Sequence, residues 1–190
     1  MQNLNVMIVG VGGQGTLLAS RLIGNVMIAA GNDVKVSEVH GMSQRGGSVV
    51  TYVKAGDKVA SPIIELGEAD VILAFEQLEA ARWLPYLRPD GKIIVNTQSI
   101  DPMPVITGAA EYPSGVIGSL SAAGADVVSV DALSLADKAG SSKAVNVVLI
   151  GFMAKHMEFD KEIWIDAIRS TVPEKFLELN MKAFELGYNS

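Results

Sequence analysis

The sequence predicts a single α/β domain over residues 1–190, with three layers and a mostly parallel, partly mixed β-sheet. Three observations support this prediction. Short apolar, partly β-branched runs alternate along the chain with helix-like segments. A glycine-rich turn joins the first of these runs to the first helix-like segment. The chain has 190 residues, of which 49% are hydrophobic, and this is enough for one well-buried core.

The glycine-rich turn has the pattern Gly-x-Gly-x-x-Gly between an expected strand, Leu4–Val9, and an expected helix, Thr16–Ala30. The candidate ligand-binding residues in it are Gly10, Gly12, Gly13, Gln14 and Gly15. In a Rossmann-like fold, such a turn lets backbone approach a ligand while helix N–H groups attract an anion. The turn therefore either binds an anionic, nucleotide-like ligand or only lets the strand and the helix pack closely.

A second strand is expected at Asp33–Val39, and it should form a β-α-β unit whose two strands are a parallel pair. Glu38 lies near its end, where dinucleotide-binding folds place the acid that binds a ribose hydroxyl. The alternative is an acidic strand-end residue in solvent.

A polar loop, residues 40–47, leads directly into a strand at Ser48–Val53. Because a connection this short has no room for a crossover helix, it predicts antiparallel or mixed pairing. The candidate binding residues in the loop are His40, Ser43, Gln44, Arg45, Gly46 and Gly47. Arg45 either binds a phosphate, a carboxylate or an acidic side chain of a partner, or pairs with a local acid such as Glu38. His40 is an acid–base candidate, although a histidine near a turn is more often a hydrogen-bonded structural group.

The β-α-β rhythm returns after this loop. The expected elements are a strand at Ala69–Phe75, a helix at Gln77–Leu87, a turn at 89–91, strands at Lys92–Asn96 and Asp126–Val130, and helices at Asp131–Ala139, Ser142–Met157, Asp160–Ser170 and Pro173–Gly187. Pro85 should kink or shorten its helix.

The segment Thr97–Gly124 is either a partner-contacting excursion or a small hairpin. Asn146 interrupts an apolar helix and should make a structural hydrogen bond, and the last two helices should cover the sheet edge.

Composition excludes several classes of function. The net charge of −6 and the pI near 4.9, without a basic stripe, argue against nucleic acid as a partner. The chain has no cysteine to form a disulfide or to ligate an iron–sulfur cluster, and its two histidines, His40 and His156, make a metal site unexpected. The first residues lack a basic segment and the apolar run Leu4–Val9 is short, so we expect no membrane association and a cytoplasmic location.

Four segments together resemble the gamma-type subunits of 2-oxoacid:acceptor (ferredoxin) oxidoreductases, and more narrowly the beta subunits of indolepyruvate ferredoxin oxidoreductases. The segments are Gly10–Gly15, Glu38–Gly47, Glu76–Ala80 and Asn146–Gly151. The most specific part is Gly41-Met42-Ser43-Gln44-Arg45-Gly46-Gly47, after Glu38-Val39-His40. The resemblance covers nearly the whole chain.

This resemblance implies an oxidative decarboxylation of indolepyruvate or another arylpyruvate, with coenzyme A and oxidised ferredoxin, to acyl-CoA, carbon dioxide and reduced ferredoxin. It also implies a larger alpha subunit that holds thiamine diphosphate and the iron–sulfur clusters and that transfers electrons to ferredoxin. The present chain would bind no cofactor by itself, although coenzyme A is a possible ligand. Independently, a chain without cysteine has no ligand for a cluster.

Two alternatives remain open at this stage. A free-standing NAD-binding oxidoreductase is supported by Gly10–Gly15 and Glu38, and it predicts that NADH binds the chain alone. A non-catalytic assembly module predicts a glycine turn that is empty or filled by a side chain, together with a large apolar face. The nearly all-round apolar segment Ser142–Met157 further predicts self-association of the chain in the absence of a partner.

Overall fold

The computed structural model describes residues 3–38 and 46–190 and contains a six-stranded sheet in the order β2-β3-β1-β4-β5-β6. The strands are β1 (Leu4–Val11), β2 (Asp33–Glu38), β3 (Ser48–Gly56), β4 (Ala69–Ala74), β5 (Leu87–Asn96) and β6 (Asp126–Val130). β3 is antiparallel to both of its neighbours, whereas the pairs β1–β4, β4–β5 and β5–β6 are parallel. The prediction of a mostly parallel, partly mixed sheet is therefore confirmed.

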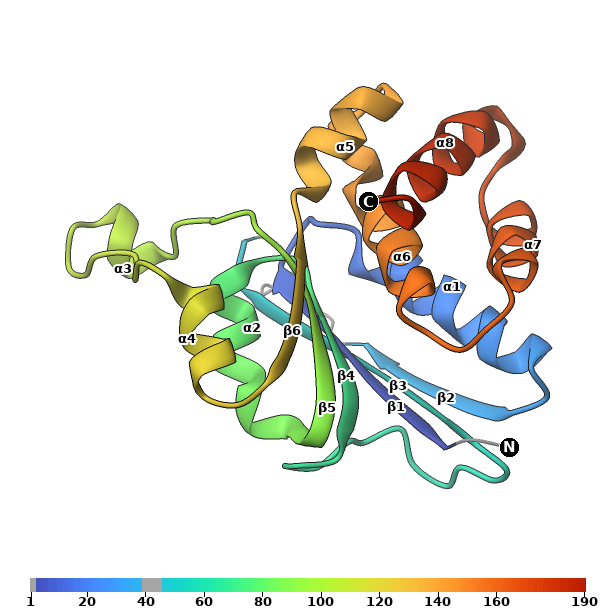
Figure 1. The fold of residues 1–190 in the computed structure, drawn as a ribbon, viewed down its shortest axis with the longest axis horizontal. Helices are drawn as coiled ribbons and strands as arrows, with labels where there is room; N and C mark the ends of the chain where they lie inside the picture. Colours follow the sequence, from blue (N-terminus) through green and yellow to red (C-terminus); the bar gives the residue numbers. More distant parts are fainter. Residues whose placement is uncertain (1–2, 39–45) are drawn as a thin grey trace.

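Helices cover both faces of the sheet and make the three expected layers (Figure 1). They are α1 (Thr16–Ala29), α2 (Gln77–Trp83), α3 (Met103–Ile106), α4 (Val116–Ala122), α5 (Ala132–Ala139), α6 (Val145–Lys155), α7 (Lys161–Thr171) and α8 (Leu177–Tyr188), with 3-10 turns at Leu84–Tyr86, Ser142–Ala144 and Glu174–Phe176. α2 and α4 lie on one side of the sheet, and α1, α5 and α6 lie on the other. Within residues 3–38 and 46–190, no helix has the length and apolarity needed to cross a bilayer.

One topological prediction was wrong. β1 and β2 were expected to be adjacent parallel strands, but β3 lies between them and pairs antiparallel with each. The physical reason lies in the side chains. β3 carries the buried residues Val49, Val50 and Val53, whereas β2 exposes Lys35 and Val36. The more apolar strand takes the inner position, and the strand with an exposed lysine becomes the sheet edge.

The helix expected at Gln77–Leu87 is shorter, because the α-helical part ends at Trp83 and a 3-10 turn contains Pro85. This agrees with the expected effect of a proline that has no N–H to donate. The turn expected at residues 89–91 is an irregularity inside β5: its partners on β4 pass from Ala69↔Leu87 to Val71↔Lys92, and Asp90 has a φ of 62°. Residues 97–124 contain the helices α3 and α4, so the hairpin alternative was wrong.

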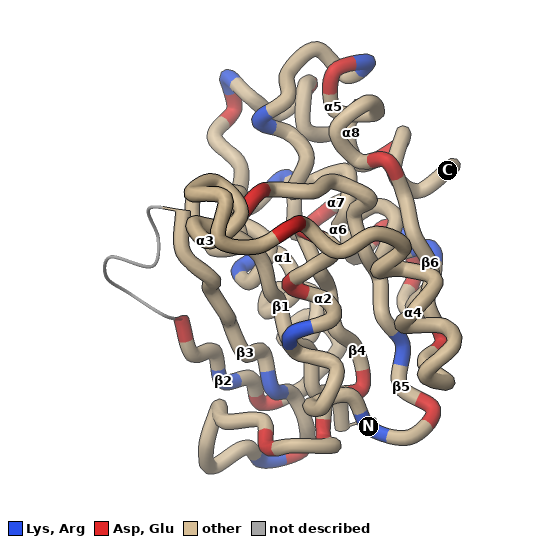
Figure 2. Tube along the Cα trace, turned by 90° about the vertical axis from the view of Figure 1, so that its left-hand side faces the viewer, with Lys and Arg blue, Asp and Glu red and all other residues tan. Residues whose placement is uncertain are grey.

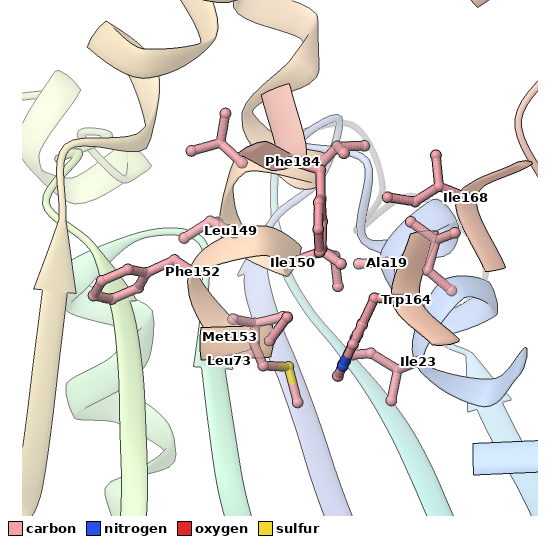
Figure 3. Close-up of a cluster of buried hydrophobic side chains, with 14 of the residues drawn as sticks. Ala19, Ile23, Leu73, Leu149, Ile150, Phe152, Met153, Trp164, Ile168 and Phe184 are labelled. Atoms are coloured by element: carbon pink, nitrogen blue, oxygen red, sulfur yellow. The ribbon is translucent and has the colours of Figure 1, made fainter. Parts of the chain in front are cut away.

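The last two helices were expected to cover the sheet edge, and this prediction was wrong. Instead, α8 packs on α6 and α7 packs on α1, so together they form an outer layer of helices (Figure 1). Figure 3 shows the resulting core, in which Trp164, Ile168 and Phe184 meet α6 and α1 above Leu73 of the sheet. The apolar surface of α6 is therefore covered within the chain, which removes the physical reason for expecting self-association.

Candidate functional site

The candidate site lies at the carboxyl ends of the parallel strands. The helix that follows β1 lies on one face of the sheet and the helix that follows β4 lies on the other, so the chain leaves these neighbouring strands in opposite directions. Such a switch point opens a crevice, which is the usual ligand position in α/β sheets. A cavity of about 490 Å³ lies here. Its lining residues are Gly13, Gln14, Gly15, Gln98, Leu133, Ser142, Lys143 and Val145.

The glycine turn borders this cavity with a backbone that larger residues would obstruct. Gly15 has a φ of 85°, and a Cβ atom there would lie 2.5 Å from Asn146 Nδ2. A Cβ atom at Gly10 would lie 2.8 Å from Gln14 Oε1 and 2.9 Å from Phe75 Cβ. All three distances are well inside van der Waals contact, so these two positions require glycine. The two glycines therefore let the turn pack closely against Phe75, at the end of β4, and against Asn146 of α6.

The side chain of Gln14 folds back into the turn. Its Oε1 accepts a hydrogen bond from Val11 N at 2.7 Å, and its Nε2 donates to Phe75 O at 3.1 Å. This amide thereby joins the end of β1 to the end of β4 and fills the inner side of the turn. The outer side, at the start of α1, lines the cavity.

The cavity is electrostatically suited to an anion. Three helices begin beside it: Gly15 precedes α1, Leu133 lies in the first turn of α5, and the turn Ser142–Ala144 leads into α6. The N-terminus of a helix carries a partial positive charge and N–H groups without a partner in the helix. At α5, the capping carboxylate of Asp131 accepts from Ser134 N, so the starts of α1 and α6 are the more open ones. Lys143 adds a full positive charge on an exposed side chain. The eight described lining residues contain no carboxylate, so the arrangement suits binding of an anionic group.

The structure brings the two predicted glycine-rich segments together. Gly12 N donates to Gly47 O at 2.9 Å, and the next residue, Ser48, donates through its hydroxyl to Glu79 Oε2 at 2.5 Å. Gly46 has a φ of 93°, in the left-handed region. The end of the polar loop is thus held by the glycine turn on one side and by α2 on the other. His40, Ser43, Gln44 and Arg45 lie outside the described residues.

Glu38 occupies a different place from the other candidates. Its Oε1 accepts a hydrogen bond from Ser20 Oγ of α1 at 2.8 Å. It lines a separate cavity of about 320 Å³ with Ser20, Arg21 and Val36, and β3 separates its strand from β1. In this topology Glu38 is not on the strand next to the glycine turn, which weakens the comparison with a ribose-binding acid.

Sequence reasoning missed a buried carboxylate that organises the excursion after β5. Glu76, which is 1% exposed, accepts hydrogen bonds from Glu79 N at 2.9 Å and Ile100 N at 3.2 Å, and also from the Tyr112 hydroxyl. Burial raises the pKa of Tyr112, and the hydrogen bond to Glu76 raises this pKa further. The carboxylate therefore ties α2 to both ends of the segment that contains α3. Glu76 at a strand end was a visible signal, whereas nothing marked Tyr112.

Three residues near the cavity also escaped prediction: Asn96, Gln98 and Lys143. Asn96 and Gln98 stand at the carboxyl end of a predicted parallel strand, and this position was the available signal. Lys143 reaches the cavity only because α6 packs beside α1, so no local pattern marked it. The predicted structural bond of Asn146 is confirmed, since its Nδ2 donates to Gly15 O at 3.3 Å.

Charged residues of both signs are interspersed along the described trace, and no basic stripe follows it (Figure 2). A search of the described residues finds no group of three or more His, Cys, Asp and Glu side chains arranged to hold a metal ion. The electrostatic character of the cavity is therefore local, and it comes from helix ends and Lys143.

Comparison with known proteins agrees with this fold. The family model described as pyruvate ferredoxin/flavodoxin oxidoreductase matches residues 5–190, and the chain belongs to this family. It is 43% identical to the indolepyruvate oxidoreductase subunit IorB of Archaeoglobus fulgidus, over 98% of this chain and 94% of that protein. By this family membership the chain is an oxidoreductase subunit, and the resemblance found in its sequence is confirmed.

Solved structures share the fold. The gamma subunit of a keto/oxoacid ferredoxin oxidoreductase from Geobacter sulfurreducens superposes with a TM-score of 0.71 at 24% identity, covering 98% of this chain and 96% of that one. A 2-oxoglutarate:ferredoxin oxidoreductase from Magnetococcus marinus, with 2-oxoglutarate, coenzyme A and succinyl-CoA bound, gives a TM-score of 0.73 at 18% identity. The match covers 100% of this chain and 31% of that one, so the same fold also occurs within a much longer polypeptide.

Proposed function

We propose that this chain is the small, cluster-free subunit of an oxidoreductase that acts on indolepyruvate or another arylpyruvate. In the reaction, a 2-oxoacid, coenzyme A and two oxidised ferredoxins give an acyl-CoA, carbon dioxide, a proton and two reduced ferredoxins. The bond between the two carbonyl carbons breaks, a thioester forms, and each ferredoxin takes one electron. Support comes from the name of the A. fulgidus relative and from the absence of cysteine in this sequence.

The electron-transfer groups then belong to a larger alpha subunit, which we propose holds thiamine diphosphate and the iron–sulfur clusters. This chain contributes binding and orientation of a substrate at a site that the two subunits complete together. The observation that carries this role is the convergence of three helix starts and Lys143 on one cavity. We propose that this cavity binds an anionic part of coenzyme A, which carries several phosphate groups. The presence of coenzyme A in the M. marinus enzyme supports this choice of ligand.

The test uses the complex purified with its larger subunit and measures KM for coenzyme A. Lys143→Ala should raise KM about tenfold with kcat little changed, because it removes one charge-assisted contact from a partly solvated site. Lys143→Arg should keep most of the affinity. Lys138→Ala removes the same charge from the exposed face of α5 and serves as the control. Equal KM values for the Lys143→Ala and Lys138→Ala complexes would rule out this role for the cavity.

The polar loop is the second part of the proposed site. On the sequence pattern, Arg45 contributes a guanidinium toward the same ligand, beside Gly46 and Gly47, whose position against Gly12 supports this. Calorimetric titration of coenzyme A into the complex should show weaker binding for Arg45→Ala than for the unaltered protein. Identical heats would remove Arg45 from the site.

A specific observation supports a second candidate, a non-catalytic assembly module. Gln14 fills the inner side of the glycine turn, as that alternative predicts. In that case the larger subunit would carry the whole coenzyme A site, and no substitution along the cavity of this chain would change KM. The NAD-binding alternative was supported by Gly10–Gly15 and Glu38, and it has less support now that β3 separates the strand of Glu38 from β1. A fluorescence titration of the isolated chain with NADH tests it directly.

A further inference from the structure

Three side-chain amides stand next to one another beside the cavity, and the orientation of two of them is fixed by backbone groups. Gln14 accepts from Val11 N and donates to Phe75 O. Asn96 is fully buried; its Oδ1 accepts from Ala132 N at 3.1 Å, and its Nδ2 donates to Phe75 O at 3.1 Å. A backbone N–H only donates and a backbone carbonyl only accepts, so neither amide can be reversed without losing both bonds.

The third amide, Gln98, must respond to the other two. Asn96 Nδ2 lies 3.3 Å from Gln98 Oε1, and Gln14 Nε2 lies 3.5 Å from the same oxygen. Both neighbours present N–H groups, so the carbonyl oxygen of Gln98 faces them. The NH2 group of a planar amide then points to the other side. Gln98 is half-buried and lines the 490 Å³ cavity, and among the described residues no acceptor contacts its Nε2.

We propose that Gln98 is a specificity-determining residue that directs its NH2 group toward an oxygen of the ligand in this cavity. The inference rests on the proposed function, in which that oxygen belongs to an anionic part of coenzyme A. A donor that is oriented before binding loses little side-chain freedom when the ligand arrives. It also discriminates, because a ligand group that is itself a donor or a cation meets the two N–H groups of Gln98 and the ammonium group of Lys143.

The decisive variant is Gln98→Glu. A carboxylate still accepts from Gln14 and Asn96, so the internal hydrogen bonds and the stability of the fold should be retained. The outward atom, however, changes from a donor to a negatively charged acceptor. KM for coenzyme A of the complex should rise about a hundredfold with kcat little changed, which is the combined effect of losing a hydrogen bond to a charged group and adding a repulsive charge. The loss should diminish at lower pH, as the new carboxyl group takes up a proton.

Two further variants complete the test. Gln98→Met removes the amide without adding charge and should raise KM about tenfold. Asn25→Asp introduces the same charge on the exposed part of α1, outside the cavity, and should leave KM unchanged.

The possible outcomes separate the two proposals. If Lys143→Ala raises KM and Gln98→Glu does not, the role of Gln98 is overturned while the proposed function stands. If neither variant changes KM, both proposals fail. If Gln98→Glu destabilises the fold or its KM does not depend on pH, the inferred orientation of the amide is wrong.

Discussion

The two ends of α6 are held by different kinds of interaction. In its second half, α6 crosses α8 with the backbones in contact: a Cβ atom at Gly151 would lie 2.1 Å from Phe184 O, and one at Gly187 would lie 2.0 Å from Val148 O. At its first turn, α6 meets the glycine turn through a single directional hydrogen bond, from Asn146 Nδ2 to Gly15 O. The helix crossing requires glycine, because any side chain would meet the facing backbone. The contact at the first turn instead requires a donor on residue 146 that faces the carbonyl oxygen of Gly15.

The difference teaches that the helix crossing contributes mainly to the stability of the fold, whereas the residues near the crevice also determine ligand selectivity. The helix crossing contributes dispersion and the exclusion of water, which any extra volume disrupts. The crevice side is built from side-chain amides, whose shapes tolerate replacement but whose donors and acceptors do not. Substitutions at the crossing should therefore change stability, whereas substitutions near the crevice should also change ligand binding. The predictions below test that division in order of expected effect.

The largest effect is expected at the crossing. Gly151→Ala and Gly187→Ala should each destabilise the fold by at least about 3 kcal/mol, because the added methyl group meets backbone that has no rotamer to change. Gly118→Ala on α4 is the matched control. It has open space around the new Cβ atom and should stabilise the helix by about 0.5–1 kcal/mol. Urea unfolding of the three variants measures this, and similar midpoints for all three would contradict the close approach.

The second largest effect on stability is expected at Asn146, where α6 contacts the glycine turn. Asn146→Leu keeps the branched skeleton of four heavy atoms but removes the bonds to Gly15 O and from Val147 N, so it should cost about 1–2 kcal/mol in free energy of unfolding. It should also raise KM for coenzyme A, because Gly15 lines the cavity. Asn180→Leu on α8 is matched, since Asn180 is similarly buried and donates to Phe176 O. If Asn180→Leu changed the KM of the complex as much as Asn146→Leu does, the proposed difference between the crevice and the helix crossing would be wrong.

The smallest effect is expected at the partly buried hydrogen bond between Tyr112 and Glu76. Tyr112→Phe should cost about 1 kcal/mol in free energy of unfolding at neutral pH. The pKa of Tyr112 is raised from its ordinary value of 10.0 by burial and by Glu76. Its contribution is thus fully present below pH 10 and is lost above it, by up to about 1.4 kcal/mol per pH unit, as the unfolded chain releases the proton first. The stability difference between the two proteins should shrink above pH 10, and a constant difference would contradict this.

Much of the order of elements was predictable because it depends on neighbouring residues. Glycines at fixed spacing after an apolar run predicted the turn before α1, and Pro85 predicted the early end of α2. The sequence also marked Gly46 and Gly47 as candidate binding residues, and the structure places Gly47 against the first turn through the bond from Gly12 N to Gly47 O.

Other features depended on contacts between distant segments, and sequence reasoning missed them. The position of β3 between β1 and β2 was set by which strand offers more apolar surface to the core, a comparison that no single window contains. The packing of α8 on α6 depends on Gly151 and Gly187, which lie 36 residues apart in the sequence. Gln98 gained its proposed role only when Gln14 and Asn96 were found beside it.

By itself, the amino-acid sequence determined the alternation of strands and helices, the glycine turn and the absence of any thiol ligand for a cluster. These properties follow from hydrophobic periodicity, backbone freedom and composition, which act over a few neighbouring residues or none. The tertiary structure alone decided which strand is inner, where α8 rests and which way the amides of the crevice point. Those choices come from burial and from donor–acceptor pairing between residues far apart in the chain, and such energies exist only once the segments have met.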